Sequence, residues 1–307
     1  MANWKYYKNG NYTVGIDLDN GTKVRFNDKD TLDADMPESA DVNLTDWCDG
    51  GCPYCYRNCT EQGKHADILN EKIFDSMHPW MEIALGGGNV LAHPDLDEFL
   101  VRCRDKNLIP SITVNQMHFE KEIDRLRKYR DDKLIYGVGV SIINPTDNLI
   151  REIREFPNAV VHLIAGITPL STFEKLANNG LKVLILGYKD VGRGESFFNH
   201  NANTVDAKLE WLRNFIPNLI KSKWFEVVSF DNLALKQLDV KNHVHPRWWK
   251  EHYMGDDGVD GELTSASMYI DLVAQTYARN SFSDNVRKIK EHNINKMFED
   301  LRRSDGN

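Results

Sequence analysis

The chain has 307 residues, of which 41% are hydrophobic and 27% charged, a composition typical of one large globular domain or of a domain with small additions. Its net charge of −8 argues against a nucleic-acid polymer as partner, because proteins that follow a phosphate backbone carry basic surfaces. No apolar run approaches the roughly 20 residues of a membrane span, and the N-terminus lacks the apolar core of a signal peptide. We therefore expect a cytoplasmic protein.

Two Asn-Gly pairs mark a small N-terminal unit. Asn9-Gly10 and Asn20-Gly21 each separate two β-rich runs of residues. Asn-Gly favours a two-residue hairpin turn, because both residues tolerate a positive φ. Residues 1–35 are therefore predicted to form a three-stranded β meander ahead of the main domain.

Short apolar strands alternate with amphipathic helices from residue 36 to residue 220. Strands are expected near residues 41–45, 82–85, 111–114, 136–143, 160–165 and 182–186. Helices are expected near residues 66–77, 95–106, 118–131, 146–155, 170–178 and 204–216. The strands are apolar on both faces, as parallel strands covered by helices must be. The pattern predicts an α/β fold, either a partial (βα)6 barrel or an open doubly wound sheet, with the chemistry at the C-terminal ends of the strands.

The alternation ends after residue 220. Residues 224–230 are compatible with one more strand, 254–261 with an acidic, glycine-rich turn, 268–273 with a strand and 284–302 with a charged helix. Residues 221–307 are therefore expected to form an α+β cap on the main domain.

Three of the five cysteines, Cys48, Cys52 and Cys55, directly follow the first predicted barrel strand. Cysteines this close in a cytoplasmic chain bind metal more often than they form disulfides. Three thiolates can hold three irons of a cubane cluster and leave the fourth iron open to an exchangeable ligand. A structural zinc site or an electron-transfer cluster would need a fourth protein ligand, for which Cys59 is a candidate. Cys103 lies on an apolar helical stripe and is expected to be a core thiol.

The C-x3-C-x2-C pattern, with Tyr54 before the third cysteine, resembles the signature of the radical S-adenosylmethionine (SAM) superfamily. The resemblance covers about residues 40–190 and implies a partial (βα)6 TIM-like barrel. It also implies that the three cysteines bind a [4Fe-4S] cluster and that SAM chelates the open iron. One electron then cleaves SAM to a 5′-deoxyadenosyl radical, which abstracts a hydrogen atom from the substrate. An external electron donor of the flavodoxin or ferredoxin type is implied as well.

Further residues resemble the SAM contacts of this family. Gly86-Gly87-Gly88-Asn89 stands where the family has a Gly-Gly-Glu segment that binds the methionine amine. Asn89 replaces the usual Glu there, and an Asn carbonyl can also accept a hydrogen bond. The other implied cofactor contacts are the aromatic residue of the cysteine motif and positions at the ends of later strands: Tyr54, Asn115, Ser141, Gly166 and Tyr188.

The substrate cannot be identified from the sequence, and three functional classes stay open. Residues 268–281 resemble the auxiliary-cluster domains of peptide-modifying radical SAM enzymes, but no cysteine follows Cys103. The missing second cluster favours a small-molecule or nucleotide substrate, and the resemblance of the tail favours a peptide. A non-catalytic iron-sulfur protein is the third class.

Two glycines beside Arg193, on the loop after the sixth strand, favour an anion cradle or else a solvated charged loop. We expect Lys189 and Arg193 to contact the substrate. The tail should cover the barrel mouth, because a radical must be shielded from water. Trp248 and Trp249 belong either to this lid or to a packing cluster. A chain ending near residue 220 is then expected to keep its cluster but to uncouple SAM cleavage from substrate turnover.

Overall fold

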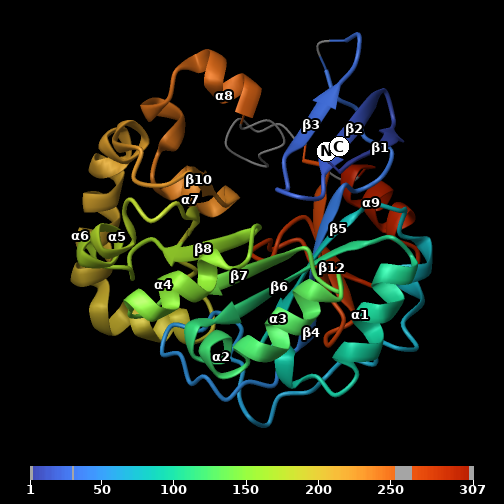
Figure 1. The fold of residues 1–307 in the computed structure, drawn as a ribbon, viewed down its shortest axis with the longest axis horizontal. Coiled ribbons are helices and arrows are strands. Elements are labelled where there is room, and N and C mark those ends of the chain that lie inside the picture. The colour runs from blue at the N-terminus through green and yellow to red at the C-terminus, as the bar shows by residue number, and fades with distance from the viewer. Residues whose placement is uncertain (1–2, 30, 253–264, 304–307) are drawn as a thin grey trace.

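The computed structural model describes residues 3–29, 31–252 and 265–303 and shows a mixed α/β protein built on one ten-stranded sheet (Figure 1). The order in this sheet is β10-β9-β8-β7-β6-β5-β4-β11-β12-β13, and three other strands form a separate sheet in the order β1-β2-β3. The strands are β1 (Trp4–Asn9), β2 (Tyr12–Asp17), β3 (Lys23–Phe26), β4 (Ser39–Thr45), β5 (Glu82–Gly87), β6 (Ile109–Asn115), β7 (Gly137–Ser141), β8 (Ala159–Ile164), β9 (Lys182–Leu186), β10 (Val227–Phe230), β11 (Ser267–Asp271), β12 (Thr276–Ala278) and β13 (Arg287–Lys288).

The strands from β10 through β11 are parallel, and β12 and β13 are antiparallel to their neighbours. Helices connect most of the parallel strands, and Figure 1 shows α1, α3 and α4 on one side of the sheet. The helices are η1 (Lys72–Ser76), η2 (Val90–Ala92), α1 (Leu96–Asp105), α2 (Gln116–Lys121), α3 (Ile123–Asp131), α4 (Asp147–Arg154), α5 (Leu170–Leu176), α6 (Arg193–Ser222), α7 (Asn232–Gln237), η3 (Val240–His243), α8 (Pro246–His252) and α9 (Ile294–Arg303), where η marks a 3-10 helix.

The core lies between the sheet and its helices. Val42, Ile83 and Ile112 of neighbouring strands are at most 1% exposed. They belong to one apolar cluster with Leu96 and Phe99 of α1. Because side chains alternate along a strand, the residues between these positions point to the opposite, inner face of the barrel.

The inner face carries small and polar side chains. Asp41, Ala84, Ser111 and Gly137 are aligned in register across β4 to β7. The described strands of this sheet end at β10 on one side and at β13 on the other, so the barrel is partial. The predicted α/β fold with a partial barrel and an N-terminal β meander is confirmed.

Several predicted helices have different bounds. Residues 66–77 contain only the 3-10 helix η1, because the preceding chain bonds back to β4 instead, as in the hydrogen bond from Ala66 N to Leu44 O (2.9 Å). The predicted helix 118–131 is divided at Glu122 (φ −111°) into α2 and α3. The predicted helix 204–216 is part of the longer α6, which has a break at Asn201. In 284–302, Arg287 and Lys288 pair with β12, so α9 begins only at Ile294.

The tail contributes strands to the main sheet as well as helices. β10 pairs with β9, and β11 pairs with β4, so residues 221–307 extend both edges of the barrel. α9 joins the helical side, where Ile294 N donates to Ser76 Oγ at 2.8 Å. Trp249 is 9% exposed within the core and Trp248 is 54% exposed, so packing is the role of Trp249. The turn predicted at 254–261 lies outside the described residues.

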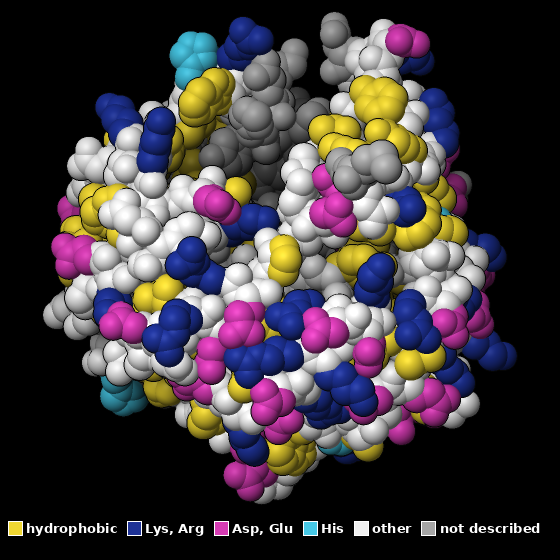
Figure 2. Space-filling model, in the orientation of Figure 1, with side chains coloured by type: hydrophobic (Ala, Val, Ile, Leu, Met, Phe, Trp, Pro, Cys, Tyr) yellow, Lys and Arg dark blue, Asp and Glu magenta, His cyan; other side chains and the backbone are white. Residues whose placement is uncertain are grey.

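The surface in Figure 2 carries side chains of both charges in close mixture. Ion pairs link the outer helices, such as Arg125 with Asp97 (2.6 Å) and Arg127 with Glu155 (2.8 Å). The described side chains on this face form no broad basic patch of the kind that binds nucleic acid. Among the residues that the structure describes, no helix is long and apolar enough to cross a membrane.

Candidate metal and cofactor site

The cysteines lie on a loop that begins directly after β4 and that we call the cysteine loop (residues 46–65). The loop folds back on its own start. Cys48 N donates to Thr60 O (2.9 Å) and Asp46 N to Lys64 O (2.9 Å). It therefore stands at the C-terminal end of the parallel strands, where barrel chemistry is expected.

The thiols of Cys48, Cys52 and Cys55 are half-buried. Burial raises the pKa of Cys48 and of Cys52. A hydrogen bond from the thiol of Cys59 is the largest cause that lowers the pKa of Cys55 to about 5. Cys59 itself is 3% exposed, and its pKa is raised by the same contact. Cys103 is buried in the core as expected, at 2% exposure.

The spacing of the sulfur atoms fits a cluster better than a single ion. A zinc ion holds its ligands at about 2.0–2.3 Å and so draws them close together. The ligand atoms of Cys48, Asp49 and His118 all lie within 4.8 Å of one another. The three sulfur atoms of Cys48, Cys52 and Cys55 are not all this close together. A cubane takes one thiolate at each of three irons and so separates the three sulfur atoms.

Arg193, at the start of α6, orders the cysteine loop from the other side of the barrel mouth. Its backbone N–H donates to Cys55 O (3.0 Å) and its Nε to Cys52 O (3.0 Å). Both terminal nitrogens donate to Cys59 O at 3.1 Å. The guanidinium of Arg193 therefore binds the cysteine loop. The sequence had indicated a substrate contact for Arg193 and not this structural role.

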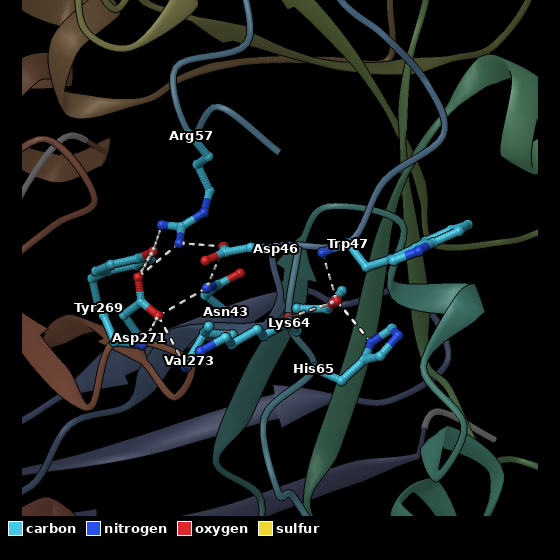
Figure 3. A network of polar contacts seen from close by, with 11 residues as sticks. Asn43, Asp46, Trp47, Arg57, Lys64, His65, Tyr269, Asp271 and Val273 are labelled. Atoms are coloured by element: carbon cyan, nitrogen blue, oxygen red, sulfur yellow. Dashed lines mark hydrogen bonds and ion pairs between the residues drawn. The ribbon is translucent and has the colours of Figure 1, made fainter. Parts of the chain in front are cut away.

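Arg57 ties the same loop to the tail (Figure 3). Its guanidinium lies 2.7 Å from Asp46 Oδ1 and 2.7 Å from Asp271 Oδ2, and it also donates to the hydroxyl of Tyr269. Asn43 Nδ2 on β4 donates to Asp271 Oδ1 at 2.8 Å. Burial would raise the pKa of Asp271, but the Arg57 charge and the hydrogen bonds outweigh it and hold this pKa below its usual range. The network joins the cysteine loop, β4 and β11.

The glycine segment after β5 packs directly against the cysteine loop. Gly87 has φ +121°, and a Cβ there would overlap Asn43 Oδ1; a Cβ on Gly88 would overlap Trp47 O. The backbone N–H of Gly88 donates to Thr45 O (2.6 Å), and that of Asn89 to Trp47 O (2.8 Å). Gly87 and Gly88 are therefore required for this close approach. Gly86 is less constrained, since the nearest atom to its Cβ position is 3.9 Å away.

The side chain of Asn89 is buried beside the cysteines, at 6% exposure. Its Nδ2 donates to Asp49 Oδ1 (3.2 Å), which lies 2.7 Å from His118 Nε2. Asn89 Oδ1 has no hydrogen-bond partner. A buried carbonyl oxygen without a donor is rare in folded proteins and fits a ligand that supplies an N–H group.

Two of the predicted strand-end residues lie next to each other at the cysteine loop. Asn115 Nδ2 is 3.6 Å from Cys52 Sγ, and its Oδ1 caps α2 by accepting from Met117 N (3.0 Å). Ser141, at the end of β7, is in register with Asn115. The structure therefore brings this part of the predicted site together.

The other predicted contacts have clear structural roles. The ring of Tyr54 packs edge-on against Phe197, with centroids 5.8 Å apart. Gly166 has φ +78°, and a Cβ there would lie 2.8 Å from Val205 Cγ1 of α6. The backbone N–H and C=O of Tyr188 both bond the side chain of Gln237 at 2.8 Å, so the N–H that the sequence offered to adenine is already paired.

Lys189 lies between the cysteine loop and the tail. Its Nζ donates to Ser281 Oγ (2.7 Å) and stands 4.1 Å from the ring centre of Tyr56. Asp41 is solvent-accessible, yet the protein atoms around it on the inner face raise its pKa by desolvation, and the charge of Lys189 opposes this rise. Sequence reasoning missed Asp41 as an inner-face residue, although a charged residue within an apolar strand was a usable signal.

Comparison with known proteins identifies the family. The model of the radical SAM superfamily matches residues 42–195, about half of the chain. The chain therefore belongs to the radical SAM superfamily, as its cysteine motif predicted. Membership implies an iron-sulfur cluster and SAM. The half-buried thiols and the unpaired oxygen of Asn89 fit both groups.

The fold is similar to that of SuiB from Streptococcus suis. The structure of SuiB bound to precursor peptide SuiA is matched at TM-score 0.58 and 11% identity, over 94% of this chain and 86% of that chain. The structure of SuiB bound to S-adenosylmethionine is matched at TM-score 0.56 and 11% identity, over 95% and 86%. Likeness at this identity shows a common fold. A search of curated proteins gives no significant match.

Proposed function

We propose that Cys48, Cys52 and Cys55 bind a [4Fe-4S] cluster at which SAM is reductively cleaved, so that a substrate hydrogen atom is abstracted. The main support is that three thiols share one loop, which Arg57 and Arg193 hold at the barrel mouth. Cys59 is buried at 3% exposure and its carbonyl accepts from Arg193, which favours three cluster ligands over four. The bound cluster and SAM supply the electron transfer and the 5′-deoxyadenosyl radical, and we expect the electron from a flavodoxin- or ferredoxin-type donor.

In this proposal the protein orients SAM and keeps water away. The unpaired Oδ1 of Asn89 accepts from the methionine ammonium group. The neighbouring carboxylate of Asp49 supplies the negative charge that Asn89 lacks, because Asn89 and His118 hold it in place. Ser141 and Gly166 remain proposed contacts to the nucleoside, whereas the backbone N–H and C=O of Tyr188 are bonded to Gln237.

The test uses anaerobically reconstituted protein. About four irons per chain should bind, and dithionite with SAM should release 5′-deoxyadenosine, measured by mass spectrometry. Replacing Cys48, Cys52 or Cys55 with Ala should abolish iron binding and SAM cleavage, whereas Cys103→Ala should change neither. Stoichiometric zinc without iron uptake would contradict the cluster, and a full cluster that binds SAM without cleaving it would contradict the reaction.

A peptide is the substrate class that we favour over a small molecule or nucleotide. The support is the match, over 94% of this chain, to a fold whose structure contains a bound precursor peptide. Lys189, between the cysteine loop and Ser281 of the tail, is the proposed substrate contact. A short peptide encoded beside the gene should gain a mass change when incubated with the loaded enzyme. If no such peptide is modified while small-molecule candidates are, the peptide assignment is wrong.

A further inference from the structure

One histidine stands inside the barrel. His162 lies on β8 between Val161 and Leu163, which belong to the apolar core. Its side chain therefore points to the inner face. The ring lies over Gly139 of β7, where a Cβ would be 2.6 Å from Nε2. The absence of a side chain at Gly139 makes room for the imidazole.

His162 belongs to the same row of inner-face residues as the cluster contact. Asn115 of β6 is in register with Ser141 of β7, and Ser141 with His162 of β8. Neighbouring strands are about 4.8 Å apart, so His162 stands about 10 Å along the row from Asn115. Asn115 in turn lies 3.6 Å from Cys52 Sγ. A SAM molecule bound at the cluster is long enough to extend along this row.

The imidazole is neutral, and its Nδ1 is buried without a hydrogen-bond partner. Burial lowers the pKa of His162 to about 4, so near neutral pH one ring nitrogen donates and the other accepts. The side chain is 9% exposed, and its Nδ1 has no hydrogen-bond partner. The next residue in the row, Leu184, offers no polar side chain. A hydroxyl group matches this ring in either tautomer, because a hydroxyl both donates and accepts.

We infer that His162 binds a ribose hydroxyl of SAM and so positions the nucleoside above the inner face of β7 and β8. The inference rests on the proposed function, because it takes SAM as the ligand of this site. A hydroxyl of the substrate is the other source of the same chemistry, and the experiment separates the two.

The test measures SAM affinity for the full-length, cluster-loaded protein with the cluster oxidised, so that no cleavage occurs. His162→Phe keeps an aromatic ring of similar size and removes both ring nitrogens. It should weaken SAM binding about 5- to 30-fold, the range expected for one buried hydrogen bond. His162→Gln retains an amide donor and acceptor and should recover part of the loss. His78→Phe is the matched control, because both ring nitrogens of His78 lie at backbone carbonyls of Pro79 and Pro37.

SAM analogues that lack the 2′- or the 3′-hydroxyl complete the test. One of them should bind the wild type more weakly than SAM does, and this difference should vanish in His162→Phe. Equal discrimination in both proteins, or an unchanged SAM affinity in His162→Phe, overturns the inference and leaves the substrate as the source of a hydroxyl. The inference is also overturned if the wild type binds both deoxy analogues as tightly as it binds SAM. Failure to assemble a cluster or to bind SAM is a different result, which contradicts the proposed function itself.

Discussion

The substitution Asp271→Asn tests whether the tail holds the cysteine loop in place. Asp271 is 8% exposed in its side chain and Arg57 is 13% exposed, and their charges lie 2.7 Å apart. Breaking a buried ion pair costs about 3–5 kcal/mol. Arg57 keeps Asp46 as a second partner at 2.7 Å, and Asn still accepts backbone hydrogen bonds, so we expect a loss of about 2–3 kcal/mol.

The loss should depend on pH in a defined direction. The folded-state pKa of Asp271 lies below its ordinary value, so the stabilising effect is present above the unfolded-state pKa of about 4. It disappears as the pH falls through the folded-state pKa. The gap between wild type and Asp271→Asn should therefore be full at pH 7 and shrink below about pH 4.

Urea unfolding of the cluster-free protein measures the free energy, and iron release to a chelator measures the effect on the cysteine loop. Asp124→Asn is the control, because Asp124 is 92% exposed and pairs with Arg127 on the surface, where an ion pair contributes at most about 1 kcal/mol. The reasoning is refuted if Asp271→Asn unfolds at the same urea concentration as Asp124→Asn and releases iron at the wild-type rate.

Two further substitutions probe the cysteine loop. Cys59→Ala should keep about four irons but lower the reduction potential of the cluster, because hydrogen bonds to the ligating sulfur atoms favour reduction; a potentiometric titration with an unchanged midpoint would count against this contact. Arg193→Met removes the side-chain hydrogen bonds to Cys52 O and Cys59 O and should speed chelator-driven iron release about tenfold, the factor for about 1.4 kcal/mol. An unchanged release rate would show that Arg193 does not order the loop.

The barrel and the position of the cysteine loop could be predicted from the sequence, because both depend on local sequence patterns. The strands from β4 to β9 lie at the predicted places, and Cys48 lies on the loop directly after β4. Asn115 was predicted from the resemblance of its strand end to the Thr-Asn ending of the family, and it lies 3.6 Å from Cys52 Sγ. Helix bounds were predicted less well where a non-helical residue interrupts the helical pattern, as Glu122 does between α2 and α3.

The role of the tail could not be predicted in this way. β11 pairs with β4 across more than 220 intervening residues, and the partner of Arg57 is Asp271, at a separation of 214 residues. No local pattern specifies such a pair. That a chain ending near residue 220 keeps its cluster stays a prediction. In the structure, removing the tail would expose the edge of β4 and leave Arg57 without Asp271.

The buried polar atoms that lack partners are also unevenly placed. Six side-chain atoms of this kind occur among the described residues, and four of them belong to Asn43, Arg57, Asn89 and His162. These four stand on inner strand ends or on adjoining loops. Such an atom costs about 1–3 kcal/mol if nothing pairs with it, so a concentration at one end of a barrel needs a reason. The SAM molecule proposed for this site would pair with two of them, Asn89 Oδ1 and His162 Nδ1, in a single binding event.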